Sequence, residues 1–202
     1  MNAEFRIDGL RLTTDRLILR AFQEEDLEDF FTYAKVEEVG EMAGWKHHES
    51  IEETRTILDR FIKGDHVFAI VLKESGKVIG SLGIERYGME NRLTEFQGLR
   101  GRELGFVLSR DYWGQGLMPE AVNRVIDYLF YDYDLDFLTS GYFVENVQSK
   151  RVQEKCLFRP YRRLKVETST GTHDTILNLL LNPSRNLKLE FSHPETLIIN
   201  PS

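Results

Sequence analysis

Residues 103–130 read ELGFVLSRDYWGQGLMPEAVNRVIDYLF, and three patterns of local structure follow one another along them. Apolar side chains alternate over residues 103–108, which predicts a strand. Gly114 and Gly116 predict a tight turn, because glycine adopts backbone conformations that other residues avoid. Pro119 then suits the opening of a helix, where its missing N–H group costs nothing. The helix carries an apolar stripe at helical spacing, made of Ala121, Val122, Val125, Ile126, Leu129 and Phe130.

A strand, a glycine turn and a helix in this order form a cradle for an anion. The backbone N–H groups of the turn point at one spot, and the helix dipole favours negative charge there. The two common nucleotide signatures fit poorly. A P-loop requires Ser or Thr after Gly-Lys, but Val78 follows Gly76-Lys77. A dinucleotide fingerprint requires a third glycine where Pro119 stands.

The rest of the chain alternates between strand patterns and helix patterns, which indicates a mixed α/β fold. Ser50 and Glu53 have the spacing of a capping box at the start of a helix. Asn146 is a good N-cap for a helix that runs to about Cys156. Besides these, we expect a helix over 24–34, a polar loop over 87–101, and strands over 17–20, 66–73, 78–85, 137–145, 165–170 and 174–181.

Composition restricts the classes of function. The chain has 202 residues, a net charge of −7 and 41% hydrophobic residues, which suits one domain with a full core. No apolar run approaches the ~20 residues that a membrane helix needs, and no basic patch suggests nucleic acid. Its single cysteine and the absence of a signal-peptide pattern favour a cytoplasmic protein without a metal cluster. We expect a domain over 1–182 and a tail over 183–202, whose strand-like segment 187–191 suggests an arm that packs on this subunit or, in a homodimer, on another.

Several motifs together resemble the GNAT N-acetyltransferases, and most closely their RimJ/RimL-like branch. The resemblance covers about residues 10–182. Its motifs are LTTDRLILR at 12–20, Trp45 followed by SIEET at 50–54, ELGFVL at 103–108, YWGQG at 112–116, PEA at 119–121 and NVQSKRVQEK at 146–155. It implies a mixed, mostly antiparallel sheet with a splayed parallel pair, flanked by about four helices. It also implies acetyl transfer from acetyl-CoA to a primary amine by direct attack, with no metal.

The resemblance also assigns roles to residues. The backbone of Phe106, Val107 and Leu108 would pair with the pantetheine arm of acetyl-CoA. Asn146 and Ser149 would contact the cofactor near its thioester, and Ser149 would protonate the departing thiolate. Trp45 would line the acceptor pocket, and Cys156 would have no nucleophilic role. The amides that would hold the pyrophosphate are those of Trp113, Gly114, Gln115, Gly116, Leu117 and Met118.

The base that deprotonates the amine is less well defined by the pattern. Glu103, at the start of the strand over 103–108, is the first candidate, with Glu85 and Glu145 as alternatives. A water chain that carries the proton away is the other route. The acceptor would be a protein N-terminus or a small amine.

Three departures from the family pattern keep a second interpretation open, a non-catalytic acyl-CoA sensor or interaction module. Asp111 places a carboxylate near the pyrophosphate, so we expect its side chain to turn away. Gln153 stands where many members have a tyrosine acid. Leu157 replaces a glycine, which predicts a different exit from the last helix.

Overall fold

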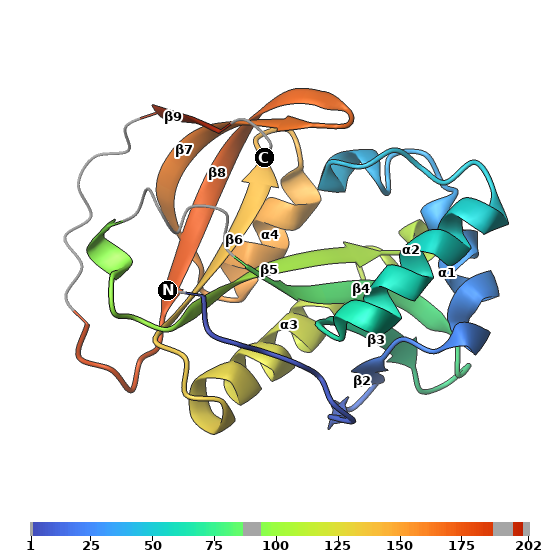
Figure 1. Cartoon of the computed structure of the whole chain (residues 1–202), viewed down its shortest axis with the longest axis horizontal. Coiled ribbons are helices and arrows are strands. Elements are labelled where there is room, and N and C mark those ends of the chain that lie inside the picture. The colour runs from blue at the N-terminus through green and yellow to red at the C-terminus, as the bar shows by residue number, and fades with distance from the viewer. Residues whose placement is uncertain (1, 87–93, 188–195, 200–202) are drawn as a thin grey trace.

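The computed structural model describes residues 2–86, 94–187 and 196–199, and it contains one mixed sheet with helices on both faces (Figure 1). The strand order is β1-β2-β3-β4-β5-β6-β8-β7-β9. Parallel pairing joins β5 to β6 and β7 to β9, and the other neighbours are antiparallel. The strands are β1 (Leu12–Thr13), β2 (Leu17–Ala21), β3 (Val67–Leu72), β4 (Val78–Glu85), β5 (Gly101–Leu108), β6 (Phe137–Phe143), β7 (Arg159–Thr168), β8 (Gly171–Leu181) and β9 (Thr196–Ile199). The predicted fold class is confirmed.

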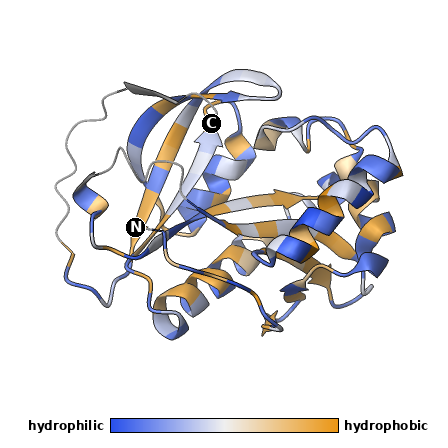
Figure 2. Cartoon of the chain, in the orientation of Figure 1, coloured by the Kyte–Doolittle hydropathy of each residue, from blue (hydrophilic) through white to orange (hydrophobic). Residues whose placement is uncertain are grey.

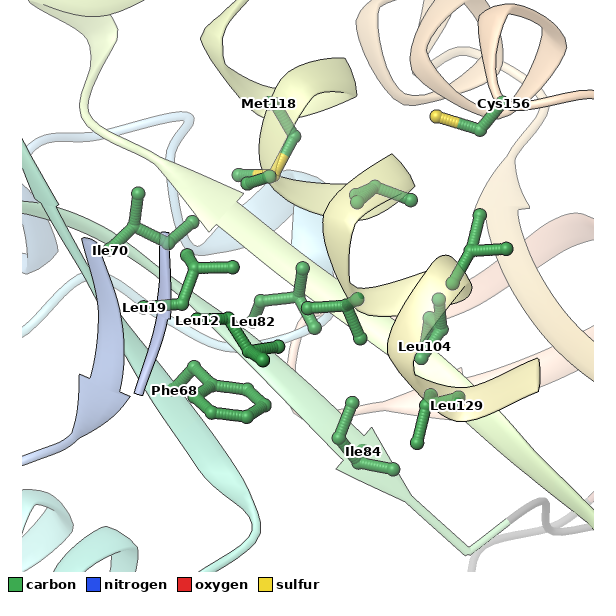
Figure 3. Close-up of a cluster of buried hydrophobic side chains, with 14 of the residues drawn as sticks. Leu12, Leu19, Phe68, Ile70, Leu82, Ile84, Leu104, Met118, Leu129 and Cys156 are labelled. Atoms are coloured by element: carbon green, nitrogen blue, oxygen red, sulfur yellow. The ribbon is translucent and has the colours of Figure 1, made fainter. Parts of the chain in front are cut away.

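Four α-helices cover the sheet within the described residues: α1 (Leu27–Ala34), α2 (Ile51–Gly64), α3 (Leu117–Asp127) and α4 (Val147–Lys155). Strand β3 explains the two layers. Phe68 and Ile70 pack with residues of α3, whereas Ala69 and Val71 pack with α1 and α2. Figure 3 shows the first of these clusters, and the apolar central strands are visible in Figure 2. The predicted burial of this strand on both faces is confirmed.

The parallel pair β5–β6 separates soon after it forms. Pairing covers three positions, from Gly101 opposite Phe137 to Glu103 opposite Thr139. One residue further along each strand, a side-chain hydrogen bond still joins them: the Ser140 hydroxyl donates to the Leu104 carbonyl over 2.8 Å. Beyond it, the two strands diverge (Figure 1). The remaining half of β5 therefore has a free edge toward β6, as the predicted splayed pair requires.

Some element boundaries differ from the sequence prediction. Helix α3 begins at Leu117, so Pro119 is its third residue, still within the turn whose N–H groups lack intrahelical partners. The last hairpin, β7–β8, is longer than predicted. Most of the strand predicted over 187–191 lies outside the described residues, and a strand is found instead at β9, paired with β7 of the same chain. The homodimer contact and the domain boundary at 182 stay predictions.

The polar loop predicted over 87–101 is described only from residue 94 onward. It contains a short 3₁₀ helix, η3 (Thr94–Phe96), and β5 already begins at Gly101. Phe96 is fully buried and stacks on Phe137, with 4.4 Å between ring centroids. This contact packs the segment before β5 against the apolar cluster formed with β6, β7 and β8.

Both predicted N-caps are present. The Ser50 hydroxyl accepts from the Glu53 amide over 3.1 Å, but the Glu53 carboxylate accepts from the amide of Glu49 and not of Ser50. The Asn146 side chain accepts from the Ser149 amide over 2.9 Å. Each cap satisfies an amide that the helix itself leaves without a partner.

The exit from α4 corrects the prediction made for Leu157. Its φ is 65°, in the left-handed region, so the chain leaves the helix as a glycine would. The side chain is 65% exposed and gains little from packing. Leucine at this position therefore carries backbone strain without compensation from burial.

We expect Leu157→Gly to stabilise the protein by up to about 1 kcal/mol, because glycine adopts this conformation without the Cβ clash. Urea denaturation would measure the change in the free energy of unfolding. Leu157→Ala is the control, since it removes the side chain but keeps Cβ. Equal stability of the glycine and alanine variants would show that the backbone conformation is not the cause.

Candidate functional site

Two adjoining cavities open where β5 and β6 separate. The first cavity, of about 310 Å³, lies between β5, α3 and α4, and the second, of about 410 Å³, lies along β4, β5, β6 and the β7–β8 hairpin. Both are lined by Met42, Ala43, Phe106, Asn146 and Ser149. A molecule in one cavity can therefore reach a molecule in the other at these shared residues.

The glycine turn forms one end of the first cavity. Gly114 and Gly116 have φ values of 76° and 75°, and Gly116 is the N-cap of α3. Apart from its chain neighbours, no described residue has a heavy atom within 4 Å of the Cβ position at Gly114, so a ligand has room to approach the backbone. The Trp113 indole donates to the Leu108 carbonyl over 2.8 Å and ties the turn to β5. The predicted residues that line this cavity are Phe106, Val107, Leu108, Trp113, Gly114, Gly116, Leu117, Met118, Asn146 and Ser149.

Two residues of the glycine turn that the sequence analysis discussed, Gln115 and Asp111, do not line the first cavity. Gln115 does not line the first cavity, and its side-chain amide donates to the Asp111 carbonyl over 3.2 Å. Of the six residues whose amides were predicted to hold the pyrophosphate, Gln115 is therefore the one that does not line this cavity. Asp111 lines neither cavity, in agreement with the expectation that its carboxylate turns away.

Sequence analysis missed the cations of the first cavity. Arg151 and Lys155 of α4 line it, one helical turn apart. Their spacing after the Asn146 cap was the available signal, since residues four apart share one face of a helix. Arg16 was also missed: it donates to the Gln115 carbonyl over 3.0 Å, and Glu120 holds its guanidinium at 2.7 Å. Arg16 thus holds the glycine turn through a backbone carbonyl, whereas Arg151 and Lys155 give the cavity itself a positive charge.

The resemblance implies that the first cavity holds the phosphates of acetyl-CoA. Arg151→Ala combined with Lys155→Ala should then weaken acetyl-CoA binding about tenfold, because two positive charges beside those phosphates would be lost. Isothermal titration at two salt concentrations would measure it, and the loss should be larger at low salt. Lys150→Ala is the control, because Lys150 pairs with Glu154 at 3.8 Å and lines neither cavity. Unchanged affinity in the double variant would place the phosphates elsewhere.

Asn146 and Ser149 lie where the two cavities meet. Besides capping α4, Asn146 donates from its side-chain nitrogen to the Met42 carbonyl over 2.9 Å. Met42 belongs to the 3₁₀ turn η2 (Glu41–Ala43), which lines both cavities. One side chain thus sets the start of α4 and the position of the turn that faces it. Ser149 is held in the first turn of that helix, with its backbone on the Asn146 cap.

Two carboxylates line the second cavity. Glu103 of β5 and Glu85 of β4 are directly opposite each other in the antiparallel register, so their side chains share one face. Glu85 lies 3.2 Å from Nε2 of His66, and this hydrogen bond raises the pKa of His66. Among the described residues that line it, Arg86 is the one cation, and it pairs with the exposed Glu4 at 3.2 Å. Because of Glu85 and Glu103, the β4–β5 side of the cavity favours a cationic ligand.

Glu145 and Trp45, both singled out from the sequence, lie outside the two cavities. The Glu145 carboxylate is 2.9 Å from Nδ1 of His173, and this contact lowers the pKa of Glu145. Trp45 packs on His48, with 5.1 Å between ring centroids, beside α1 and α2. The cavity wall expected from Trp45 is formed by Met42 and Ala43 instead.

Cys156 is buried against the N-terminal part of α3, with its sulfur 3.8 Å from the Pro119 carbonyl. Burial raises the pKa of the thiol to about 12, so it stays protonated and weakly nucleophilic. Figure 3 shows this thiol within the apolar cluster. Among the described residues, no group of three His, Cys, Asp or Glu side chains is placed to hold a metal. No helix in those residues has the length and apolarity to span a bilayer.

A family model described as the acetyltransferase (GNAT) domain matches residues 16–159 of this chain. The chain belongs to the GNAT acetyltransferase family. It is accordingly an acetyl-CoA-dependent acyltransferase. The matched region contains the glycine turn, Glu103 and all of α4, and it ends where β7 begins.

Relatives and solved structures agree with this assignment. The uncharacterised N-acetyltransferase p20 of Bacillus licheniformis is 30% identical over 166 residues, which cover 76% of this acetyltransferase and 88% of p20. An acetyltransferase of the GNAT family from Bacillus anthracis is structurally similar, with a TM-score of 0.74, 21% identity, and coverage of 86% of this chain and 99% of that one.

Two further GNAT structures are similar in fold. The ribosomal-protein-S5-alanine acetyltransferase of Vibrio fischeri has a TM-score of 0.65 and 21% identity, over 86% of this chain and 97% of that one. The spermidine N-acetyltransferase of Vibrio cholerae, solved with CoA and spermine, has a TM-score of 0.66 and 19% identity, over 84% and 97%. These two proteins have different acceptors, so the shared fold leaves the acceptor of this acetyltransferase open.

Proposed function

We propose that this acetyltransferase binds acetyl-CoA in the first cavity and transfers the acetyl group to a primary amine in the second. The observation that carries the proposal is that both cavities are lined by Phe106, Asn146 and Ser149. A thioester at this junction would face the acceptor amine directly. The left-handed glycines, the N-terminus of α3 and the cations of α4 suit a pyrophosphate at the other end of the first cavity.

The acceptor side of the proposal rests on the charges of the second cavity. Glu85 and Glu103 favour an ammonium group, and apolar residues of β6 and β8 cover the opposite wall. Strand β8 and nearly all of β7 lie beyond the matched family region, so the family match alone does not describe this wall. A protein N-terminus, as in the RimJ/RimL-like branch, and a small cationic amine are the acceptors we propose, in a cytoplasmic setting.

The reaction follows from the proposed placement. Glu103 removes a proton from the ammonium group, and the amine nitrogen attacks the thioester carbon. The C–N bond forms, the C–S bond breaks, and the amine loses its second proton to solvent. The leaving sulfur takes the hydroxyl proton of Ser149, which water then restores. Asn146 holds both Ser149 and η2 in place, so that neither cavity changes shape at the junction.

Calorimetric titration with acetyl-CoA tests the binding step. We expect one molecule to bind per chain, with weaker binding of CoA fragments that lack the phosphates. The absence of binding at millimolar concentrations would contradict the proposal, because the first cavity would then serve another ligand. Binding without turnover on any amine would favour the sensor interpretation instead.

A further inference from the structure

Gln153 is completely buried in α4, one helical turn after Ser149. Its side chain has three hydrogen-bond partners. The nitrogen donates to the Gly141 carbonyl over 3.0 Å and to the Ser149 hydroxyl over 3.2 Å, and the oxygen accepts from the Asn178 amide over 3.0 Å. Gly141 and Ser149 line the second cavity, so this buried amide connects the core under α4 with the site.

The Gly141 carbonyl fixes the orientation of the Gln153 amide. A backbone carbonyl only accepts hydrogen bonds, so the group facing it must be the NH₂ group. Rotating the amide by half a turn would place two oxygens 3.0 Å apart without a proton between them. The oxygen of Gln153 therefore faces Asn178, and the second N–H faces Ser149. The direction of the Gln153–Ser149 bond follows: glutamine donates and serine accepts.

This direction decides where the proton of Ser149 goes. A serine hydroxyl has one proton and two lone pairs, and Gln153 occupies a lone pair. Within the described part of the chain, no hydrogen bond uses the Ser149 proton, and the hydroxyl lines both cavities. The proton is therefore left to donate toward the junction. A donated hydrogen bond also polarises the hydroxyl and makes it a better donor itself.

We propose that Gln153 is a positioning residue that directs the Ser149 proton to the sulfur atom of CoA. The inference rests on the proposed function, because it assigns the junction to the thioester. In the step concerned, the C–S bond has broken, and the Ser149 proton moves to the thiolate. On the core side of the hydroxyl, Gln153 presents an N–H group, which cannot accept the Ser149 proton. It takes the place of the missing tyrosine acid by acting through a serine.

The thiolate form of bound CoA provides a test that needs no acceptor amine. A hydroxyl aimed at the sulfur stabilises the thiolate, so CoA should bind more tightly relative to desulfo-CoA as the pH rises through the ionisation of the thiol. We expect the ratio of the two dissociation constants to change about tenfold in the natural protein, the effect of one charge-assisted hydrogen bond. Isothermal titration with CoA and desulfo-CoA across the alkaline range would measure it.

Variants separate positioning from structural support. Gln153→Met keeps the side-chain volume and removes the hydrogen-bond donor. The pH-dependent preference for CoA over desulfo-CoA should therefore fall to the level of the Ser149→Ala variant. The double variant should show no further loss, because both changes remove the same interaction. Asn182→Leu is the matched control: it removes a buried amide that donates to the Phe130 and Leu135 carbonyls, away from both cavities. It should lower stability and leave the preference unchanged.

Gln153→Glu is the second variant, in case the methionine variant fails to fold. At the alkaline end of the titration, where its carboxyl group is ionised, this side chain only accepts hydrogen bonds, so it would draw the Ser149 proton inward and abolish the preference. The inference would be overturned if a folded Gln153→Met or Gln153→Glu variant preferred CoA over desulfo-CoA as strongly as the natural protein does. It would also be overturned if the natural protein bound CoA without this pH-dependent preference. Failure of the natural protein to bind either ligand would overturn the proposed function itself.

Discussion

Gly116→Val is expected to weaken acetyl-CoA binding tenfold or more. Gly116 has a φ of 75° and is the N-cap of α3, at the turn that faces the first cavity. A β-branched residue is strained there by about 1–3 kcal/mol and would relax toward negative φ. That change would turn the first amides of α3 away from the pyrophosphate. Isothermal titration with acetyl-CoA measures the loss.

The chain offers a matched control in Gly76. This residue has a φ of 71°, in the turn between β3 and β4. Its Cβ position has no heavy atom within 4 Å from the described residues beyond its chain neighbours. At Gly116 the nearest atom is Nη2 of Arg16 at 3.8 Å, which is an ordinary contact. Gly76→Val should therefore lose similar stability and keep its affinity. If both variants bind acetyl-CoA equally well, the turn at Gly116 does not hold the cofactor.

Glu103→Gln is expected to lower kcat about 100-fold while binding acetyl-CoA normally. The carboxylate is lost from the second cavity, and glutamine cannot take a proton from the ammonium group. The acid limb of the pH–rate profile, which reports ionisation of the base, should disappear as well. Steady-state kinetics over a pH series measures both effects. A variant with an unaltered profile would exclude this carboxylate as the base.

Glu85→Gln is the matched control for that experiment, because Glu85 stands opposite Glu103 on the same face of the sheet. Its carboxylate is engaged by His66, so we expect it to contribute to the binding of a cationic acceptor more than to proton transfer. The variant should raise KM with little change in kcat. A large loss of kcat in Glu85→Gln, and not in Glu103→Gln, would reverse the two roles.

Local patterns made much of this structure predictable. The turn at Gly114 and Gly116 follows from the conformational freedom of glycine, and the start of α4 follows from Asn146 as a cap. Strand β3 was evident from a run of apolar residues that suits burial on both faces. Each of these features depends on a few neighbouring residues, so sequence alone contains the information.

The features that were missed depend on contacts between distant segments. Arg16 reaches the Gln115 carbonyl across 99 positions of the chain, and Asn146 holds the Met42 carbonyl across 104. The cavity wall expected from Trp45 comes from Met42 and Ala43, because the tryptophan packs on His48 instead. Leu157 shows a different limit, since its left-handed conformation is imposed by the turn into β7 against the preference of the residue.

The most direct test of acetyl transfer is free-thiol release from acetyl-CoA, measured with product mass over a panel of N-terminal peptides, polyamines, amino acids and aminoglycosides. We predict that thiol release and acetylated amine appear in equal amounts for one class of acceptor, and that both are greatly reduced in Glu103→Gln. Tight acetyl-CoA binding with no acetylated product from any primary amine would contradict the proposed function.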